Sequence, residues 1–287
     1  MTHIAGLFAD GPTLSFEFFP PKTPAGFERL HETTEVLAGL EPTFVSMTYG
    51  AGGSTRATTR DLVIELNNRL PFPAMPHLTC VGQSKAEIRE LLEAYRDAGI
   101  QNVLALAGDP PTDGSPDEGE FTYATELIEL IRDVGEFTIG VAAFPEIHPR
   151  SPDRASDRRY LVEKLNLVDF AITQFFLEPH HFLRMRDELD ALGVDKPLLP
   201  GVMPFINVAG LRRMADMNRS HIPDELQRRL DAVDGDAEAT RLLGVEHAAA
   251  QIEVLRSEGV AGLHLYSMNR PDSIEALDDR VGLHQHV

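Results

Sequence analysis

The stretch SFEFFPP, residues 15–21, places a single glutamate among three phenylalanines. Side chains alternate between the two faces of an extended strand, so Glu17 points to one face while Phe16 and Phe18 point to the other. The two prolines that follow cannot continue the hydrogen-bond ladder of a sheet, which places Glu17 close to the C-terminal end of its strand. An ionised carboxylate in apolar surroundings is unstable unless it is paired or neutralised. The glutamate therefore needs an explanation.

Short apolar runs recur along the chain and alternate with longer amphipathic stretches. The candidate strands are TLSFEFF (13–19), TFVSMTY (43–49), AMPHLTC (74–80), NVLALAG (102–108), TIGVAAF (138–144), DFAITQFF (169–176), PLLPGVM (197–203) and GLHLYS (262–267). Helical patterns cover 86–99, where Gly99 supplies the stop, and also 123–135 and 180–193. Strands that alternate with helices predict βα units and a parallel sheet.

The spacing of the strand ends favours a closed barrel. The residues that mark these ends are Glu17, Thr48, His77, Asp109, Pro145, Gln174 and Gly201. They lie 27 to 36 positions apart, which is the length of one βα unit. Only the last interval, of about 63 positions to His264, is double, and it holds two helical patterns, 208–218 and 236–258.

We therefore predict a single domain, 1–287, folded as a (β/α)8 TIM barrel of the α/β class. An extra helical segment, at about 208–258, precedes the last strand. The alternative is an open doubly wound sheet, but the dinucleotide-binding pattern G-x-G-x-x-G is missing after the first strand.

Composition and charge exclude several classes of protein. Acidic residues number 45 against 26 basic ones, and a surface with a formal net charge of -19 repels phosphate backbones and anionic lipids. We therefore expect no nucleic-acid partner and no membrane. The lone cysteine, Cys80, cannot form an internal disulfide, and no segment has the roughly 20 apolar residues that cross a bilayer. The first residues do not resemble a signal peptide, so we expect a cytoplasmic protein.

The barrel gives Glu17 a chemical interpretation. Active sites of such barrels lie at the C-terminal ends of the strands, where Glu17 points inward. Burial among apolar groups raises the pKa of carboxyl groups, and a carboxylic acid that stays protonated near neutral pH can serve as a general acid. The alternative is a structural ion pair between Glu17 and an inward arginine or lysine.

Other polar residues give weaker signals. The glycine-rich stretch TYGAGGST (48–55) lacks the lysine of a P-loop, so a tight turn is favoured over a phosphate site. The acidic stretch 112–120 lacks EF-hand spacing, which favours a solvated loop over a calcium site. His180 and His181 lack a convincing third ligand, and we expect no metal. Gln174 lies in an apolar strand and must bond either to a core network or to a polar ligand.

Several motifs, taken together, carry a specific resemblance. They are SFEFFPPKT (15–23), FVSMTYGAGGSTR (44–56), PHLTC (76–80), GDPP (108–111), VAAFPEIHP (141–149), AITQFF (171–176), PGVMP (200–204) and LHLYSMNR (263–270). In this order, over nearly the whole chain, they resemble the 5,10-methylenetetrahydrofolate reductase family, and the length fits its bacterial type without a regulatory domain.

The resemblance implies a (β/α)8 flavoprotein of one-carbon metabolism. Such an enzyme passes a hydride from NADH or NADPH through FAD to methylenetetrahydrofolate and makes 5-methyltetrahydrofolate for methionine synthesis. Its partners would be a reduced folate and a nicotinamide dinucleotide, and a homo-oligomer is compatible with the sequence.

The resemblance also implies roles for residues at matching positions. Glu17 matches the family's acid, and Asp109 matches an aspartate beside the flavin and the pterin. Gln174 matches a glutamine on the face shared by nicotinamide and folate, and Arg270 matches an arginine near the folate. The positions that match FAD-binding residues are Thr48, Tyr49, Ala51, His77, Gly108, Asp109, Tyr123, Ala124, His148, Asp157 and Lys164. The alternatives are that Lys164 is a solvated helix residue and that His77 is a satisfied core histidine.

Four positions depart from the family pattern. Ala107 stands where many members have an arginine before Gly-Asp, and Phe144 replaces a frequent tyrosine. Met214 stands where a nicotinamide-stacking phenylalanine often lies, and Gly210 where a folate-contacting glutamine can occur. Two other functions therefore stay open, namely flavin-independent hydride transfer from NADH to the folate, and a non-catalytic folate-binding or complex-forming subunit.

Overall fold

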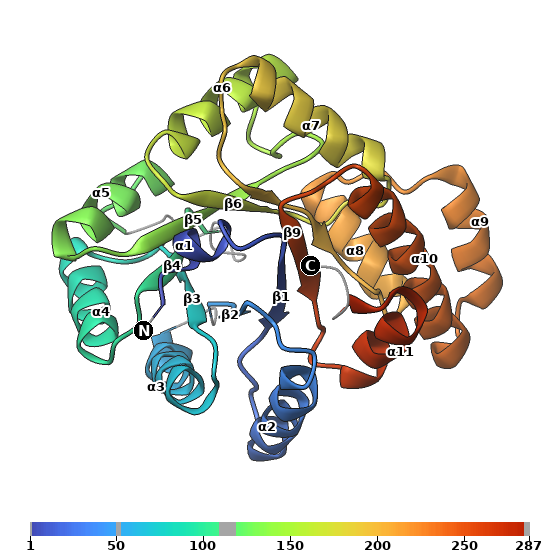
Figure 1. Cartoon of the computed structure of the whole chain (residues 1–287), viewed down its shortest axis with the longest axis horizontal. Coiled ribbons are helices and arrows are strands. Elements are labelled where there is room, and N and C mark those ends of the chain that lie inside the picture. Colours follow the sequence, from blue (N-terminus) through green and yellow to red (C-terminus); the bar gives the residue numbers. More distant parts are fainter. Residues whose placement is uncertain (1, 50–52, 109–118, 284–287) are drawn as a thin grey trace.

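The computed structural model describes residues 2–49, 53–108 and 119–283. Over these ranges the structure has one parallel sheet of nine strands, in the order β7-β6-β5-β4-β3-β2-β1-β9-β8 (Figure 1). The strands are β1 (Thr13–Phe18), β2 (Phe44–Met47), β3 (Ala74–Thr79), β4 (Asn102–Leu106), β5 (Thr138–Ala143), β6 (Phe170–Thr173), β7 (Leu198–Leu199), β8 (Gly201–Val202) and β9 (Gly262–Tyr266).

Strands β7 and β8 are the two halves of one predicted strand, interrupted at Pro200. Proline has no backbone N–H to donate to a neighbouring strand, which explains the break. The first half pairs with β6 and the second half pairs with β9. This interrupted strand therefore joins the two ends of the sheet, which confirms the predicted (β/α)8 barrel.

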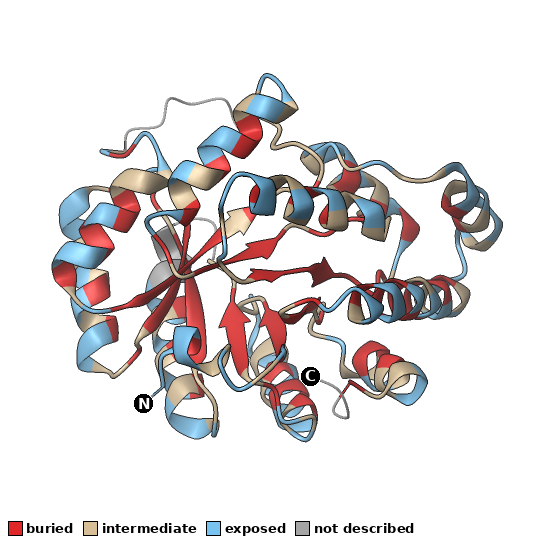
Figure 2. Cartoon of the chain, turned by 45° about the horizontal axis from the view of Figure 1, so that its top comes forward, coloured by how far each residue is buried: buried red, intermediate tan, exposed pale blue. Residues whose placement is uncertain are grey.

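Helices surround the barrel, and their outer faces are exposed whereas the strands are buried (Figure 2). They are α1 (Ile4–Leu7), α2 (Pro24–Ala38), α3 (Gly53–Arg69), α4 (Lys85–Asp97), α5 (Ala124–Val134), α6 (Arg154–Leu165), α7 (Pro179–Ala191), α8 (Val208–Asn218), α9 (Asp224–Val233), α10 (Ala237–Ser257) and α11 (Pro271–Val281). The extra segment before β9 thus holds three helices and not the two predicted. Helix α9 escaped the prediction because few of its residues are apolar, with Leu226 and Leu230 its buried ones.

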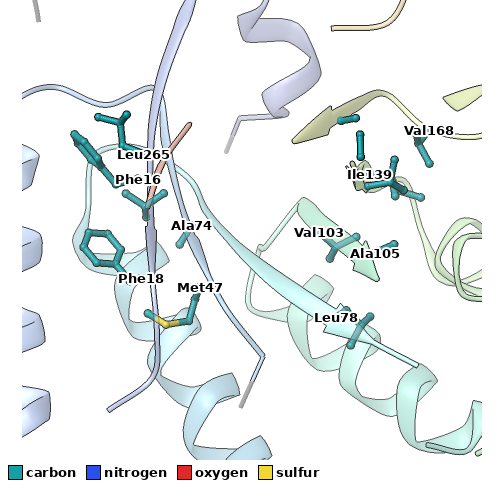
Figure 3. Close-up of a cluster of buried hydrophobic side chains, with 14 of the residues drawn as sticks. Phe16, Phe18, Met47, Ala74, Leu78, Val103, Ala105, Ile139, Val168 and Leu265 are labelled. Atoms are coloured by element: carbon teal, nitrogen blue, oxygen red, sulfur yellow. The ribbon is translucent and has the colours of Figure 1, made fainter. Parts of the chain in front are cut away.

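The core has two main layers, one on each side of the strands. Between strands and helices lies the larger layer, where Phe16 and Phe18 pack beside Met47, Ala74 and Leu265 (Figure 3). Burial of Phe16 and Phe18 on this side confirms the alternation predicted for the first strand. Since the strands are covered on both faces, the inward side chains fill the barrel and fix its shape.

Helix α1 covers the N-terminal end of the barrel. Ile4 is fully buried in the inner layer with Phe44, Leu104 and Phe170. The Ile4 backbone N–H donates to Asn102 Oδ1 at 2.8 Å, which ties the helix to the start of β4. With this end closed, the C-terminal ends of the strands form the mouth of the barrel.

Two glycines allow close approaches at the side of the barrel that holds the extra helices. A Cβ atom on Gly244 of α10 would lie 1.9 Å from the Phe205 carbonyl oxygen, and one on Gly201 would lie 2.2 Å from the Thr173 carbonyl oxygen. Both glycines let backbone approach backbone where no side chain fits. Helix α10 can therefore pack directly on the segment that follows β8.

Candidate active site

Glu17 lies at the mouth end of β1 and points into the barrel. Its Oε2 atom is 3.4 Å from His264 Nε2 of β9 and 3.5 Å from His77 Nε2 of β3. The residue is only 8% exposed. Among the described residues, no arginine or lysine forms an ion pair with it, so the structural alternative of an Arg or Lys partner finds no support there. The carboxyl group is surrounded by two imidazoles.

A hydrogen-bond chain links Glu17 to the floor of its pocket through His264. Ser15 Oγ donates to the Leu263 carbonyl oxygen at 3.2 Å and lies 2.8 Å from His264 Nδ1. Because a hydroxyl has one proton, both contacts are made only if His264 Nδ1–H donates to Ser15. A neutral His264 ring then presents an unprotonated Nε2 to Glu17, and their hydrogen bond needs a proton on the carboxyl group. A hydrogen bond between the two side chains therefore requires one proton between the carboxyl oxygen and Nε2.

His77 completes the pocket as a neutral imidazole. Burial lowers the pKa of His77 to about 4, an effect that His264 strengthens and Glu17 opposes. His77 Nε2 and Ser46 Oγ are buried, and neither has a hydrogen-bond partner among the described residues. Ser46 faces Glu17 in the register between β1 and β2. Since buried polar atoms are normally satisfied, these two suit a bound polar molecule, and His77 is not the satisfied core histidine of the alternative.

Tyr266 of β9 lies next to Glu17, with which it pairs in the register between β1 and β9, and Gln174 lies just after β6. The Tyr266 hydroxyl donates to the Thr173 carbonyl oxygen at 2.8 Å, and burial, with the charge of Glu17 adding to it, raises the pKa of Tyr266 well above its usual value. Gln174 Oε1 accepts from the Phe175 backbone N–H at 2.9 Å. The structure thus gives the Gln174 carbonyl a local partner within the segment that leaves β6.

The described positions that match FAD-binding residues lie in or after strands β2 to β5. Thr48 and Tyr49 follow β2, and Gly108 follows β4 with a φ of 89° that favours glycine. Tyr123 precedes the first residue of α5, Ala124, and is 68% exposed. Ala51 and Asp109 lie outside the described residues.

The loop after β5 carries the other matched positions. Asp157 is buried, and its carboxylate accepts from the His148 backbone N–H at 3.0 Å and from Ser151 Oγ at 2.9 Å. It also pairs with the buried Arg158 at 2.6 Å. These bonds give Asp157 a structural role in shaping the loop that holds His148.

Lys164 points toward the barrel and is not a solvated helix residue. Its Nζ donates to the Ala142 carbonyl oxygen at 3.0 Å. Burial lowers the pKa of Lys164 to about 8, an effect that Asp157 opposes and Arg150 strengthens. Arg150, which the sequence analysis did not single out, also donates to the Gly108 carbonyl oxygen at 3.4 Å. Arg150 is therefore a second cation in this region, and it contacts Gly108, the residue after Ala107.

Arg270 lies just before α11 and pairs with Asp272. Its Nη2 atom is 2.7 Å from Asp272 Oδ2, and its side chain is 48% exposed. The partner carboxylate holds the guanidinium at the rim of the mouth, and no hydrogen bond or ion pair joins Arg270 to Glu17.

These features define an enzyme of the (β/α)8-barrel class with a buried acid at its mouth. A family model described as methylenetetrahydrofolate reductase matches residues 3–282. The chain belongs to this family, and so to the oxidoreductases.

Individual relatives agree with the family match. The chain is 35% identical over 275 residues to 5,10-methylenetetrahydrofolate reductase of Pectobacterium carotovorum, a match that covers 96% of this chain and 91% of the relative. It is 36% identical over 272 residues to the Escherichia coli protein of the same name, covering 94% and 90%. The Arabidopsis thaliana protein named methylenetetrahydrofolate reductase (NADH) 1 is 37% identical, but the match covers only 48% of its length.

Solved structures show the same fold at low identity. A Clostridium thermocellum protein, described as binding two copies of 5-methyl-5,6,7,8-tetrahydrofolic acid, superposes with a TM-score of 0.66 at 14% identity and covers 98% of both chains. A dihydropteroate synthase of Xanthomonas albilineans gives 0.56 at 12% identity, covering 97% of this chain and 95% of the other. At such identities the likeness shows the fold alone. Within the described ranges, every helix is too short or too polar to cross a lipid bilayer.

Proposed function

We propose that this chain reduces 5,10-methylenetetrahydrofolate to 5-methyltetrahydrofolate with NADH or NADPH, through FAD, in a ping-pong hydride transfer with Glu17 as the general acid. The observation that carries the proposal is the Glu17 pocket, in which a buried carboxyl group lies 3.4 Å from His264 Nε2 at the mouth of the barrel. Family membership supplies the substrate class.

The reaction needs an acid at one place. Methylenetetrahydrofolate holds its one-carbon unit in a five-membered ring between N5 and N10, and hydride can attack only after the ring opens to an N5 iminium ion. Opening requires a proton at N10. Glu17 is positioned to deliver it, because the carboxyl group is buried at the mouth and its hydrogen bond to His264, which is in turn bonded to Ser15, can hold the proton in place before transfer. Transfer to N10 leaves a carboxylate between two imidazoles.

Several described residues fit FAD. Arg150 donates to the Gly108 carbonyl oxygen just after β4, and Lys164 donates to the Ala142 carbonyl oxygen of β5. These two cations suit the phosphates, and the buried Nε2 of His77 suits a polar edge of the flavin ring. When bound, the cofactor would accept a hydride from the nicotinamide dinucleotide and later donate it to the folate, so that the two substrates can use one site in turn. We assign Thr48, Tyr49, Ala51, Gly108, Asp109, Tyr123, Ala124, His148 and Asp157 to the same cofactor as proposals.

Three further residues complete the proposed site. Asp109 is proposed to hold the pterin N–H groups and to modulate the flavin, Gln174 to line the face shared by nicotinamide and folate, and Arg270 to bind the folate. Support for Gln174 and Arg270 is their place at the mouth. A homo-oligomer and a cytoplasmic location stay predictions, the latter supported by Cys80, the lone cysteine, which cannot form an internal disulfide.

One experiment separates the proposed function from its alternatives. We expect the purified protein to be yellow, to bleach when NADH is added without oxygen, and to regain its colour when methylenetetrahydrofolate follows. Turnover by a colourless protein to which FAD does not bind would instead show flavin-independent transfer. Folate binding without turnover, with and without added FAD, would show a non-catalytic subunit.

A further inference from the structure

Two histidines and two glutamates meet beside the mouth, away from the Glu17 pocket. Glu178 immediately precedes α7, and His180 and His181 lie in the first turn of that helix. His181 Nε2 is 3.7 Å from Glu178 Oε2 and 3.9 Å from Glu146 Oε2, an atom of the segment that follows β5. His180 Nδ1 is 3.9 Å from Glu178 Oε1. Four potential ligands thus converge from two consecutive βα loops.

Key polar atoms of this cluster make few hydrogen bonds within the described part of the protein. His181 Nε2 is buried and has no hydrogen-bond partner among the described residues. Glu178 precedes α7 in the capping position, but its side chain makes no capping hydrogen bond. The Glu146 carboxylate accepts the His221 backbone N–H at 3.0 and 3.1 Å, which orients it and leaves further lone pairs. A buried imidazole nitrogen between two carboxylates is an arrangement that a bound cation would satisfy.

The distances fit a small divalent ion. Zinc bonds to histidine nitrogen and carboxylate oxygen are about 2.0–2.2 Å, so that ligand atoms of a tetrahedral site lie roughly 3.4 Å apart. The observed separations of 3.7 to 3.9 Å exceed this by a few tenths of an ångström. One candidate atom each from Glu178, His180 and His181 lies within 4.8 Å of the others. Small side-chain rotations would bring these ligand atoms to the distances of a metal site, and the His180 side chain, which is 62% exposed, has room to rotate.

We propose that Glu178, His180 and His181, together with Glu146, bind a divalent transition-metal ion of the zinc type. Imidazole nitrogen with carboxylate oxygen favours such ions, whereas Mg²⁺ and Ca²⁺ prefer oxygen ligands alone. The sequence prediction of no metal rested on the lack of a third ligand for the two histidines. Glu178, two positions before His180, supplies that ligand in space.

The surroundings allow an ion to enter. Glu178 and His180 line a cavity of about 420 Å³ between α7, α9 and α10. The net charge of -19 favours cations near the surface. Arg154 and His221 act electrostatically on both Glu146 and His181, while His180 and Arg184 act on His181 as well. Arg154 is partly balanced by Glu188 at 3.6 Å.

A bound ion would link two loops of the mouth. The segment before Glu178 is fixed to α10, because Gln251 Nε2 donates to the Phe176 carbonyl oxygen at 2.8 Å and His247 Nε2 lies 3.0 Å from the Leu177 carbonyl oxygen. Glu146 belongs to the neighbouring loop, after β5. The ion would therefore hold the β5 loop to the β6 loop and α10, and binding to the folded state alone would raise the melting temperature.

The test uses untagged protein treated with a chelator and then dialysed. Zn²⁺ is titrated by calorimetry, and Co²⁺ by its visible absorption, which reports the ligand geometry. The variants are His181→Gln, Glu178→Gln and the exposed His180→Gln, which removes a ligand without disturbing the core. The matched control is His31→Gln, since His31 Nε2 pairs with Glu65 Oε1 at 3.0 Å on a different face, and no third potential ligand joins this pair among the described residues.

We expect one Zn²⁺ per chain, a higher melting temperature with Zn²⁺ but not with Mg²⁺, and affinity weakened by at least about tenfold in each of the three variants. The His31→Gln protein should bind as the wild type does. Zinc binding by His180→Gln and His181→Gln that is as strong as that of the wild type, or no binding by the wild type, would overturn the proposal.

Discussion

At the scale of single residues, the pocket explains why a carboxyl group lies among phenylalanines. Phe16 and Phe18 belong to the outer layer, whereas Glu17 faces the barrel interior. What surrounds Glu17 is polar, with His77 on one side and His264 on the other. The phenylalanines that flank Glu17 in the sequence are therefore not its neighbours in space, where two imidazoles lie beside the carboxyl group instead.

Replacing Glu17 by Gln keeps the volume and removes the acid. We expect reduction of the flavin by NADH to survive, and reduction of the folate to fall by at least about 100-fold, because a general acid contributes that much or more. The two half-reactions can be followed separately by stopped-flow absorbance. Near-normal folate turnover in Glu17→Gln would remove Glu17 from the mechanism.

Arg150 is expected to supply part of the positive charge that Ala107 lacks. A charge-assisted hydrogen bond is worth roughly 1.5–3 kcal/mol, and an exposed arginine belongs at the lower end of that range. Arg150→Ala should therefore weaken FAD binding by about tenfold, and Ala107→Arg should strengthen it. The measurement is titration of apoprotein with FAD, with Arg228→Ala on α9 as an exposed control. Unchanged affinity in Arg150→Ala would show that this guanidinium does not face the cofactor.

At the scale of elements, Gly244 sets how closely α10 approaches the barrel. A methyl group at this position would meet the Phe205 carbonyl oxygen at 1.9 Å, so the helix must move outward. We expect Gly244→Ala to lower the free energy of unfolding by about 1–3 kcal/mol, the usual cost of overpacking. Chemical denaturation measures it. Gly6→Ala in α1 is the control, since nothing lies within 4 Å of its added carbon; equal stability of both variants would contradict the close packing.

Most elements could be predicted from the sequence because apolar runs repeat at the period of a βα unit. The exceptions have local causes. Pro200 splits a predicted strand because it lacks an N–H, and α1 has only four residues, too few for a periodic pattern. In α9, buried positions are limited to Leu226 and Leu230.

The candidate site was predictable only in part. Alternation along one strand is enough to aim Glu17 inward, and that prediction is confirmed. Its hydrogen-bond chain through Ser15 and His264 depends on the pairing of β1 with β9, which no local pattern encodes. Arg150 lies in a loop, where side-chain direction follows from contacts distant in sequence and not from periodicity.

At the scale of the whole molecule, the buried His77 makes folding sensitive to acid. Its pKa is lowered by burial to about 4, against 6.5 in an unfolded chain. Between these values the unfolded state binds a proton that the folded state does not, so stability falls as the pH drops from 6.5 to 4. The loss from this residue amounts to at most about 3 kcal/mol.

His77→Gln should flatten this part of the stability curve. The measurement is the difference in unfolding free energy between wild type and variant at pH 4.5 and at pH 7.5, with His31→Gln as the control for a half-exposed histidine. A wild-type-minus-variant difference that stays constant with pH would show that His77 is not held neutral by burial.

The pairing of the first strand with the last also limits how early the barrel can close while the protein is being synthesised on a ribosome. Thr13 of β1 pairs with Gly262, and Glu17 meets its partner 247 positions later in the chain. At synthesis rates of about 5–20 residues per second, the first strand waits roughly 12–50 s for its neighbour to emerge. Throughout that time one edge of a growing sheet stays unpaired, and the acid pocket is among the last features to form.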